Sequence, residues 1–404
     1  MPRALVKAPG ALLAVMAVLP TAAFTLGCTS TTESPRSSAT SLPLSMAAGP
    51  AQGIAAAPAA PAPVPAAPVC GDPAAMPTRA KLAQLLMVGV SGAADARAVV
   101  DTHQVGGIMI GSWTDLSMLS DGSLADVAAA AGPLSLAVSV DEEGGRVSRL
   151  SGLIGSQPAP RVLAQTRTPE EVYAIALDRG RQMRGLGITV DFAPVVDVTD
   201  APASTVIGDR SFGSDPTTVT DYAGAYARGL RDAGVLPVLK HFPGHGNASG
   251  DSHAGSVVTP PLADLQASDL VPYRTLTTQA PVAVMVGHME IPGLTGSEPA
   301  SLSPAAYGLL RSGNYGGPPF NGPVFTDDLS GMRAITDRFG VADAVLRSLQ
   351  AGADVALWVT STEVPAVLDR LEQAVEAGEL SMAGVDAAVM RIAAFKGPSP
   401  SCGG

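Results

Sequence analysis

Three of the chain's five histidines fall within residues 240–253, where the sequence reads KHFPGHG and then NASGDSH. Core packing does not account for such a concentration, so the stretch is a candidate for metal binding or for acid–base chemistry. Histidine is a common zinc ligand, and the spacing of His241 and His245 would place both on one side of a helix. Pro243 and Gly244 stand between them and disfavour a helix. We therefore expect no metal or other cofactor, and a metal-dependent hydrolase is kept as an alternative.

The same stretch holds a pair suited to proton transfer. Asp251 and His253 are two residues apart in a Gly/Ser-rich segment and can hydrogen-bond as a dyad. The aspartate would fix the imidazole tautomer and favour the protonated ring, so the pair is suited to general acid and base work. By itself the pattern is a weak signal, because a loop-capping aspartate beside an exposed histidine has the same spacing.

A second acidic motif follows the apolar run Pro323–Thr326, where the sequence continues as Asp-Asp-Leu-Ser. A carboxylate that ends a strand and faces a pocket can attack an anomeric carbon, as the nucleophile of a retaining glycosidase does. Asp327 is the candidate. The alternative is that Asp327 caps the helix that follows, although Asp328 or Ser330 could do so equally well.

Two further segments combine arginines with acids and glycines. Residues 141–149 read DEEGGRVSR and begin at Asp141, and residues 208–213 read GDRSFG with Arg210 in a turn. Carboxylates and guanidinium groups can each bind sugar hydroxyls through two hydrogen bonds, so both segments are suited to gripping a polyol. Either one could instead form an internal salt bridge.

The elements that would position these groups are short apolar runs separated by amphipathic or Ala-rich segments such as Pro169–Gly185 and Thr217–Ala233. Near-continuous apolar runs with helical spacers indicate parallel strands buried on both faces, and a single-domain (β/α)₈ TIM barrel is the economical arrangement. A doubly wound open sheet is the alternative. The eight runs are Leu85–Val90, Gly107–Ile110, Leu134–Val140, Ile188–Phe192, Val235–Leu239, Val282–Val286, Pro323–Thr326 and Asp354–Val359.

Polar residues lie at the C-terminal ends of many of these runs, which supports the barrel. In a barrel the C-terminal ends of the strands converge on one face, where active sites are built. Scattered surface charge would not repeat this placement, so we expect the site there. The residues are Asp141, Asp191, Asp197, Lys240, His241, His288 and Asp327.

The N-terminal part is not predicted to fold. Residues 1–28 indicate an export signal, with positive residues followed by an apolar stretch too short to span a bilayer. The signal ends at Cys28 in a segment that resembles a bacterial lipobox, whose cysteine is lipidated; an ordinary signal peptide with an incidental cysteine is the alternative. Residues 29–69 are rich in Ser, Pro and Ala and are predicted to be a disordered tether. We expect residues 70–404 to form the folded domain.

Composition and the remaining cysteines limit the possible roles. The formal net charge is −11, so no basic footprint for nucleic acid is visible. Cys70 and Cys402 flank the predicted domain, and outside the cytoplasm such cysteines are expected to oxidise, which would tie the two ends together. Two free thiols are the alternative. We expect a monomer on the outer face of the cytoplasmic membrane, held by a lipid anchor.

Taken together, the motifs resemble those of NagZ-type β-N-acetylglucosaminidases of glycoside hydrolase family 3. The resemblance runs from about Leu82 to Ile392 and rests on several separate motifs in the family's order. They are DEEGGRVSR, DFAPVVD, GDRSF, KHFPGHG, DSH and TDDLS. Their joint occurrence by chance is negligible.

The resemblance implies a role for each matching residue. Asp327 would be the nucleophile, His253 the general acid and base, and Asp251 its orienting partner. Asp141, Arg149, Arg210, Lys240 and His241 would bind N-acetylglucosamine. The implied activity is a retaining exo-β-N-acetylglucosaminidase that acts on cell-wall muropeptides, in which GlcNAc is β-1,4-linked to MurNAc or anhydro-MurNAc. A non-catalytic, lipid-anchored glycan-binding barrel is a further alternative.

Two features depart from the family's common pattern. Many relatives are cytoplasmic recycling enzymes, whereas we expect this chain to be exported, which argues against an intracellular recycling role and leaves cell-wall turnover or recycling outside the cytoplasm. Glu142 stands where the family commonly has an uncharged residue.

Overall fold

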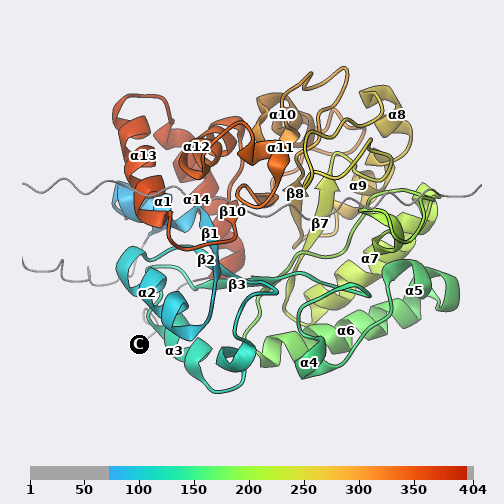
Figure 1. Cartoon of the computed structure of the whole chain (residues 1–404), viewed down its shortest axis with the longest axis horizontal. Coiled ribbons are helices and arrows are strands. Elements are labelled where there is room, and N and C mark those ends of the chain that lie inside the picture. The colour runs from blue at the N-terminus through green and yellow to red at the C-terminus, as the bar shows by residue number, and fades with distance from the viewer. Residues whose placement is uncertain (1–71, 398–404) are drawn as a thin grey trace, which may run out of the picture. The chain divides into compact units, whose positions relative to one another are not determined.

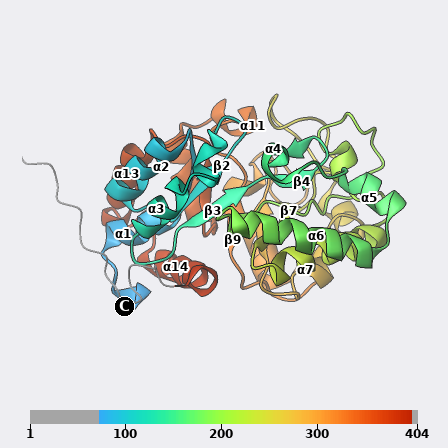
Figure 2. The same cartoon turned by 90° about the horizontal axis from the view of Figure 1, so that it is seen from below.

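Eight parallel strands form one sheet in the computed structural model, which describes residues 72–397. Each strand pairs with its neighbours in the order β10-β1-β2-β3-β6-β7-β8-β9, and helices surround the sheet (Figures 1 and 2). The strands are β1 (Leu86–Val90), β2 (Gly107–Ile110), β3 (Ala137–Val140), β6 (Val190–Asp191), β7 (Leu236–Phe242), β8 (Ala283–Val286), β9 (Val324–Thr326) and β10 (Ala356–Trp358).

The sheet closes on itself between β9 and the residue that precedes β10. Phe325 and Val355 form an isolated parallel bridge, and the amide of Thr326 donates to the carbonyl of Val355 at 3.0 Å. The predicted (β/α)₈ barrel is therefore confirmed, and the alternative of an open, doubly wound sheet is wrong.

Each of the eight predicted runs corresponds to one of these strands, although some bounds differ. In the run Leu134–Val140 the strand starts only at Ala137, and just before it the amide of Ser135 donates to the carbonyl of Gly397 at 3.2 Å. The fifth strand ends later than predicted, at Phe242, with a register irregularity after Leu239. Lys240 and His241 are therefore part of β7 and do not follow it.

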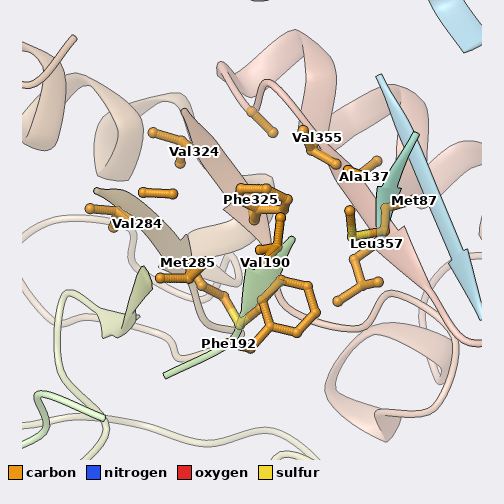
Figure 3. Packing of buried hydrophobic residues seen from close by; sticks show 14 of the residues in the cluster. Met87, Ala137, Val190, Phe192, Val284, Met285, Val324, Phe325, Val355 and Leu357 are labelled. Carbon is orange, nitrogen blue, oxygen red and sulfur yellow. The ribbon is translucent and has the colours of Figure 1, made fainter. Parts of the chain in front are cut away.

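Large side chains fill the inside of the barrel, as parallel strands buried on both faces require. Figure 3 shows Phe192, Phe325 and Met285 packed together between the strands, and all three are buried. The rings of Phe192 and Phe325 meet edge to face, with centroids 5.7 Å apart. The interior is thus a packed core and no channel, so a ligand has to bind at the C-terminal ends of the strands.

The two predicted helices are present and have well-formed starts. The helix α6 (Pro169–Gly185) has the predicted bounds, and Thr168 and Glu171 form a capping box at its first turn. The helix α7 (Pro216–Asp232) lies one residue earlier than predicted and is capped by Asp215. The two helices lie side by side in both views of the chain (Figures 1 and 2).

The remaining elements surround the sheet or follow its strands. A hairpin of β4 (Glu142–Gly144) and β5 (Val147–Ser148) comes after β3, and short 3₁₀ turns occupy Pro73–Ala75, Leu116–Leu119, Gly208–Arg210 and Ala300–Leu302. The other helices are α1 (Thr78–Gln84), α2 (Ala93–His103), α3 (Ser123–Ala129), α4 (Ser151–Ile154), α5 (Pro160–Thr166), α8 (Leu262–Ala267), α9 (Leu270–Leu276), α10 (Pro304–Ser312), α11 (Arg333–Thr336), α12 (Val341–Ala351), α13 (Val364–Glu376) and α14 (Met382–Lys396).

The predicted signal peptide, the tether and the three cysteines Cys28, Cys70 and Cys402 lie outside the described residues. Within residues 72–397, none of the helices combines the length and the apolar character needed to span a bilayer.

Candidate active site

A cavity of about 350 Å³ opens where β3, β7 and β9 end. The structure brings all eight predicted catalytic and sugar-binding residues together around it, although they come from separate parts of the chain. Its volume is near the lower end of ligand pockets, which span roughly 300–1,000 Å³. The lining residues are Asp141, Arg146, Val147, Arg149, Ser204, Val206, Ile207, Arg210, Lys240, His241, His245, Asp251, Ser252, His253, Asp327 and Met332.

One side of the cavity is a network of two cations and two carboxylates. The Nζ of Lys240 lies 2.6 Å from Asp141 Oδ1 and 2.7 Å from Glu143 Oε1. Arg210 binds both oxygens of Glu143 at 2.8 Å, in the bidentate geometry that guanidinium favours. Burial lowers the pKa of Lys240, but the two carboxylates raise it more, so the ammonium stays charged. The charges balance, and the polar groups are fixed before a ligand arrives.

A single aspartate organises the two histidines that follow this network. Asp197 Oδ2 lies 2.7 Å from His241 Nδ1, and Asp197 Oδ1 accepts the backbone amide of His245 at 2.7 Å. Burial raises the pKa of Asp197, but the two histidines lower this pKa by a larger amount and keep the carboxylate ionised. An ionised Asp197 needs a proton on His241 Nδ1, so the Nε2 of a neutral His241 is left as an acceptor.

The two adjacent aspartates after β9 have different surroundings. Asp328 holds the turn, since its carboxylate accepts the amides of Ser330 and Gly331 at 2.8 and 2.9 Å. Asp327 lines the cavity, and its Oδ1 accepts the amide of Asp328 at 2.9 Å. Burial raises the pKa of Asp327, but the neighbouring His241 and His288, the amide of Asp328 and the ammonium of Lys240 lower it by more, so the carboxylate is ionised. The alternative that Asp327 caps a helix is not supported, because Asp328 holds this turn.

The predicted dyad is formed in the structure. His253 Nδ1 lies 2.7 Å from Asp251 Oδ1, which also accepts the amide of His253 at 2.9 Å. Both side chains are open to solvent, with 59% and 46% of their surface exposed. Ser252 between them is buried: its Oγ donates to Met332 Sδ at 3.3 Å, and its carbonyl accepts the amide of Ala334 at 3.1 Å. The dyad loop is thereby docked on the segment that follows Asp327.

Glu142, the residue that departs from the family pattern, holds the hairpin that carries Arg149. Its Oε2 accepts the amides of Arg149 and Leu150 at 2.8 Å each, and its Oε1 accepts the hydroxyl of Ser148 at 2.5 Å. It also forms a buried ion pair with Arg179 on α6. The extra charge is therefore matched inside the fold, and the contacts fix the backbone at Arg149.

Removing this carboxylate should affect stability and substrate binding together. We expect Glu142→Ala to lower the free energy of unfolding by about 3–5 kcal/mol, because Arg179 is left buried without its anion. We also expect a higher KM, because the backbone at Arg149 is no longer held. Denaturant unfolding and steady-state kinetics measure the two effects.

The double variant Glu142→Ala, Arg179→Met provides the control. It should be more stable than Glu142→Ala alone, because the uncompensated charge is gone. Equal or lower stability of the double variant would contradict the role given to this ion pair.

Asp269 lies under the histidine-rich segment and should make stability depend on pH. Burial and the charge of Asp197 raise its pKa to about 6. An unfolded aspartate ionises near pH 4, so the folded state binds an extra proton between about pH 4 and 6, and stability falls as the pH rises through this window. Asp269→Asn keeps an acceptor for the amide of Val198. We expect it to raise the free energy of unfolding by about 3 kcal/mol at pH 7 and by little below pH 4.

Denaturant unfolding from pH 4 to 7 tests this expectation, with the exposed Asp126→Asn as the matched control. A gain from Asp269→Asn that is the same at every pH would show that the charge of Asp269 is not its cause.

For several residues of the site, the sequence alone predicted no role. Glu143 and Asp197 hold Arg210 and His241, but each partner is distant in the chain, so no local pattern connects them. Arg146 also lines the cavity and pairs with Asp209 at 2.9 Å. Among residues 72–397, no group of three or more His, Cys, Asp or Glu side chains is arranged to hold a metal ion.

Comparison with known proteins places the chain in a family. The model of the glycosyl hydrolase family 3 N-terminal domain matches residues 77–395. LpqI, a β-hexosaminidase of Mycobacterium tuberculosis, is 70% identical over 354 residues, which cover 86% of this chain and 91% of that protein.

Solved structures agree with this placement. A family 3 glycosyl hydrolase from Mycobacterium smegmatis has 76% identity and a TM-score of 0.81, and the match covers 81% of this chain and all of that one. A family 3 β-N-acetylglucosaminidase from a Paenibacillus species has 34% identity and a TM-score of 0.74, over 80% of this chain and 62% of that one.

A TIM barrel with these similarities is a glycosidase. The chain belongs to glycoside hydrolase family 3. The named relatives further support β-hexosaminidase activity.

Proposed function

We propose that this chain is a retaining exo-β-N-acetylglucosaminidase that removes terminal GlcNAc from peptidoglycan fragments. The observation that carries the proposal is the shared cavity, which has an ionised Asp327 at the end of β9 and the Asp251–His253 dyad on a neighbouring loop. The small volume of the cavity favours recognition of one terminal sugar. The choice of GlcNAc linked to MurNAc or anhydro-MurNAc, and a role in cell-wall turnover or recycling, rest on the resemblance to NagZ-type enzymes.

The reaction would proceed in two steps. In the first, Asp327 attacks the anomeric carbon while His253 gives its proton to the departing glycosidic oxygen, and a covalent glycosyl-enzyme forms. In the second, His253 takes a proton from water, whose oxygen bonds to the anomeric carbon and releases the carboxylate.

Lys240, Asp141 and Arg210 of the charged network, together with His241, would hold the sugar. Their donors and acceptors are already fixed, so they can bind hydroxyl groups without rearranging. Arg149, on the hairpin held by Glu142, would complete this side of the cavity.

Hydrolysis of chromogenic glycosides tests the activity. We expect turnover of a β-GlcNAc glycoside and little turnover of the matched β-glucoside, and the first product should be the β-anomer by NMR. The disaccharide GlcNAc-β-1,4-MurNAc, its anhydro form and chitobiose then compare the aglycones. Turnover that is abolished by a chelator would favour a metal-dependent hydrolase, and glycan binding without turnover would favour the non-catalytic barrel.

The proposal includes an exported, monomeric protein anchored through Cys28. It rests on the lipobox-like segment and on the Pro/Ala-rich stretch that follows. We expect the mature protein to enter the detergent phase in a phase-partition experiment, and Cys28→Ala to remain in the aqueous phase. Wild-type protein recovered unmodified from the aqueous phase would contradict the anchor and leave the enzymatic proposal untouched.

A further inference from the structure

One residue of the cavity has a buried side chain with no partner. His245 is only 4% exposed, and both of its ring nitrogens are buried without a hydrogen bond. Of the residues that line the cavity in the described part of the chain, His245 alone has this property. Buried polar groups in native proteins are nearly always hydrogen-bonded, so an imidazole left unpaired beside a cavity points to a ligand there.

The position of His245 is fixed by its neighbours. Its amide donates to Asp197, the same carboxylate that holds His241, and the two rings meet edge to face with centroids 5.9 Å apart. Gly244 has a φ of +142°, and a Cβ there would lie 2.3 Å from the Cβ of Asp269. A Cβ at Gly246 would lie 2.2 Å from the carbonyl oxygen of Val198. These close approaches exclude larger residues on either side and hold His245 in place.

The ring is neutral and lies near both catalytic groups. Burial and the neighbouring His241 lower the pKa of His245, although Asp197 and Asp327 oppose this shift. A neutral imidazole has one donor and one acceptor, which suits a hydroxyl group or a water molecule. His245 lines the same cavity as Asp327 and the Asp251–His253 dyad.

We propose that His245 is a catalytic residue of the second step and holds the water that attacks the glycosyl-enzyme. The inference rests on the proposed two-step function. The water oxygen bonds to the anomeric carbon, while the bond from that carbon to the Asp327 oxygen breaks and its electron pair returns to the carboxylate. One hydrogen of the water passes to His253 as a proton. The other stays on the new hydroxyl group and donates to the acceptor nitrogen of His245.

The geometry separates this role from sugar binding. The network of Lys240, Asp141, Arg210 and Glu143 consists of paired cations and carboxylates, whereas both ring nitrogens of His245 have no partner. His245 instead starts the loop that carries the dyad, so it is placed to act on the group that the dyad also serves. Loss of its ring should therefore slow the step that uses water and leave the first step largely unaffected.

The test is His245→Asn with a dinitrophenyl β-GlcNAc glycoside, whose leaving group needs no proton. We expect kcat to fall on the order of 10-fold to 100-fold, the effect of misplacing a reacting group. KM should fall with it, kcat/KM should stay near the wild-type value, and a burst of dinitrophenol should show that the glycosyl-enzyme accumulates. His103→Asn, in α2 and outside the cavity, is the matched control.

Each other outcome contradicts the inference. A fall in kcat/KM with a raised KM would make His245 a sugar-binding residue, and unchanged kinetics would give it no role in the reaction. Thermal unfolding of both variants separates a folding defect from either case, and His245→Gln provides a second variant if His245→Asn does not fold. A wild-type enzyme that never forms a covalent intermediate would overturn the proposed two-step function, which is a different result from any of these.

Discussion

Replacing Asp327 by alanine should abolish turnover of every β-GlcNAc substrate, with kcat reduced roughly 10⁴-fold or more, as expected for a residue that forms the covalent bond. The other residues of the site cannot replace it. Asp141 is paired with Lys240 and Asp197 with His241. Steady-state rates at saturating substrate measure the loss.

The adjacent aspartate is the natural control for this variant. Asp328→Asn keeps an oxygen acceptor for only one of the two turn amides, because the other amide then faces the NH2 group, so we expect some loss of stability but most of the activity to remain. A slowly hydrolysed fluoro sugar should label wild-type protein on the peptide that contains Asp327. Label on Asp328, together with an active Asp327→Ala variant, would reverse the assignment of the pair.

Much of the fold could be predicted from the sequence because its signals are local. Each strand is a short apolar run with a helix-forming segment behind it, and a strand buried on both faces needs no alternating pattern. Strand ends were less predictable. The late start of β3 at Ala137 accompanies a backbone contact between Ser135 and Gly397, which are distant in the chain. The extension of β7 to Phe242 depends on its pairing with β8, and nothing in the sequence of residues 240–242 indicates this pairing.

The candidate site shows the same contrast between local sequence signals and long-range contacts. Motif residues such as Asp141, Lys240 and Asp327 were predicted because chemically useful side chains follow apolar runs. The roles of their charged partners were not predicted. Glu143 and Asp197 contact Arg210 and His241 only after folding brings these distant segments together. The unpaired side chain of His245 is still harder to predict from the sequence. Its lack of a hydrogen-bond partner depends on the contacts that all the surrounding residues make in the folded chain.

Replacing His253 by alanine should affect substrates according to how much their leaving groups need a proton. For the disaccharide GlcNAc-β-1,4-MurNAc, whose leaving group is a poor one, we expect kcat/KM to fall by about 10²–10⁴-fold. For a dinitrophenyl glycoside the first step should be nearly unchanged. The second step should then become slow, because no base activates water, and a burst of dinitrophenol should appear.

Azide provides the decisive measurement for this residue. It is already an anion and needs no base, so added azide should restore turnover of the dinitrophenyl glycoside by His253→Ala and yield a β-glycosyl azide. Asp251→Asn should give smaller changes in the same direction, because it removes the charge that orients the imidazole but leaves the ring. Equal losses for both leaving groups, without rescue by azide, would exclude His253 as the proton donor. Of the two histidine variants, His253→Ala should lower kcat/KM for the disaccharide and His245→Asn should preserve it, so the pair separates the proton transfer from the placement of the water.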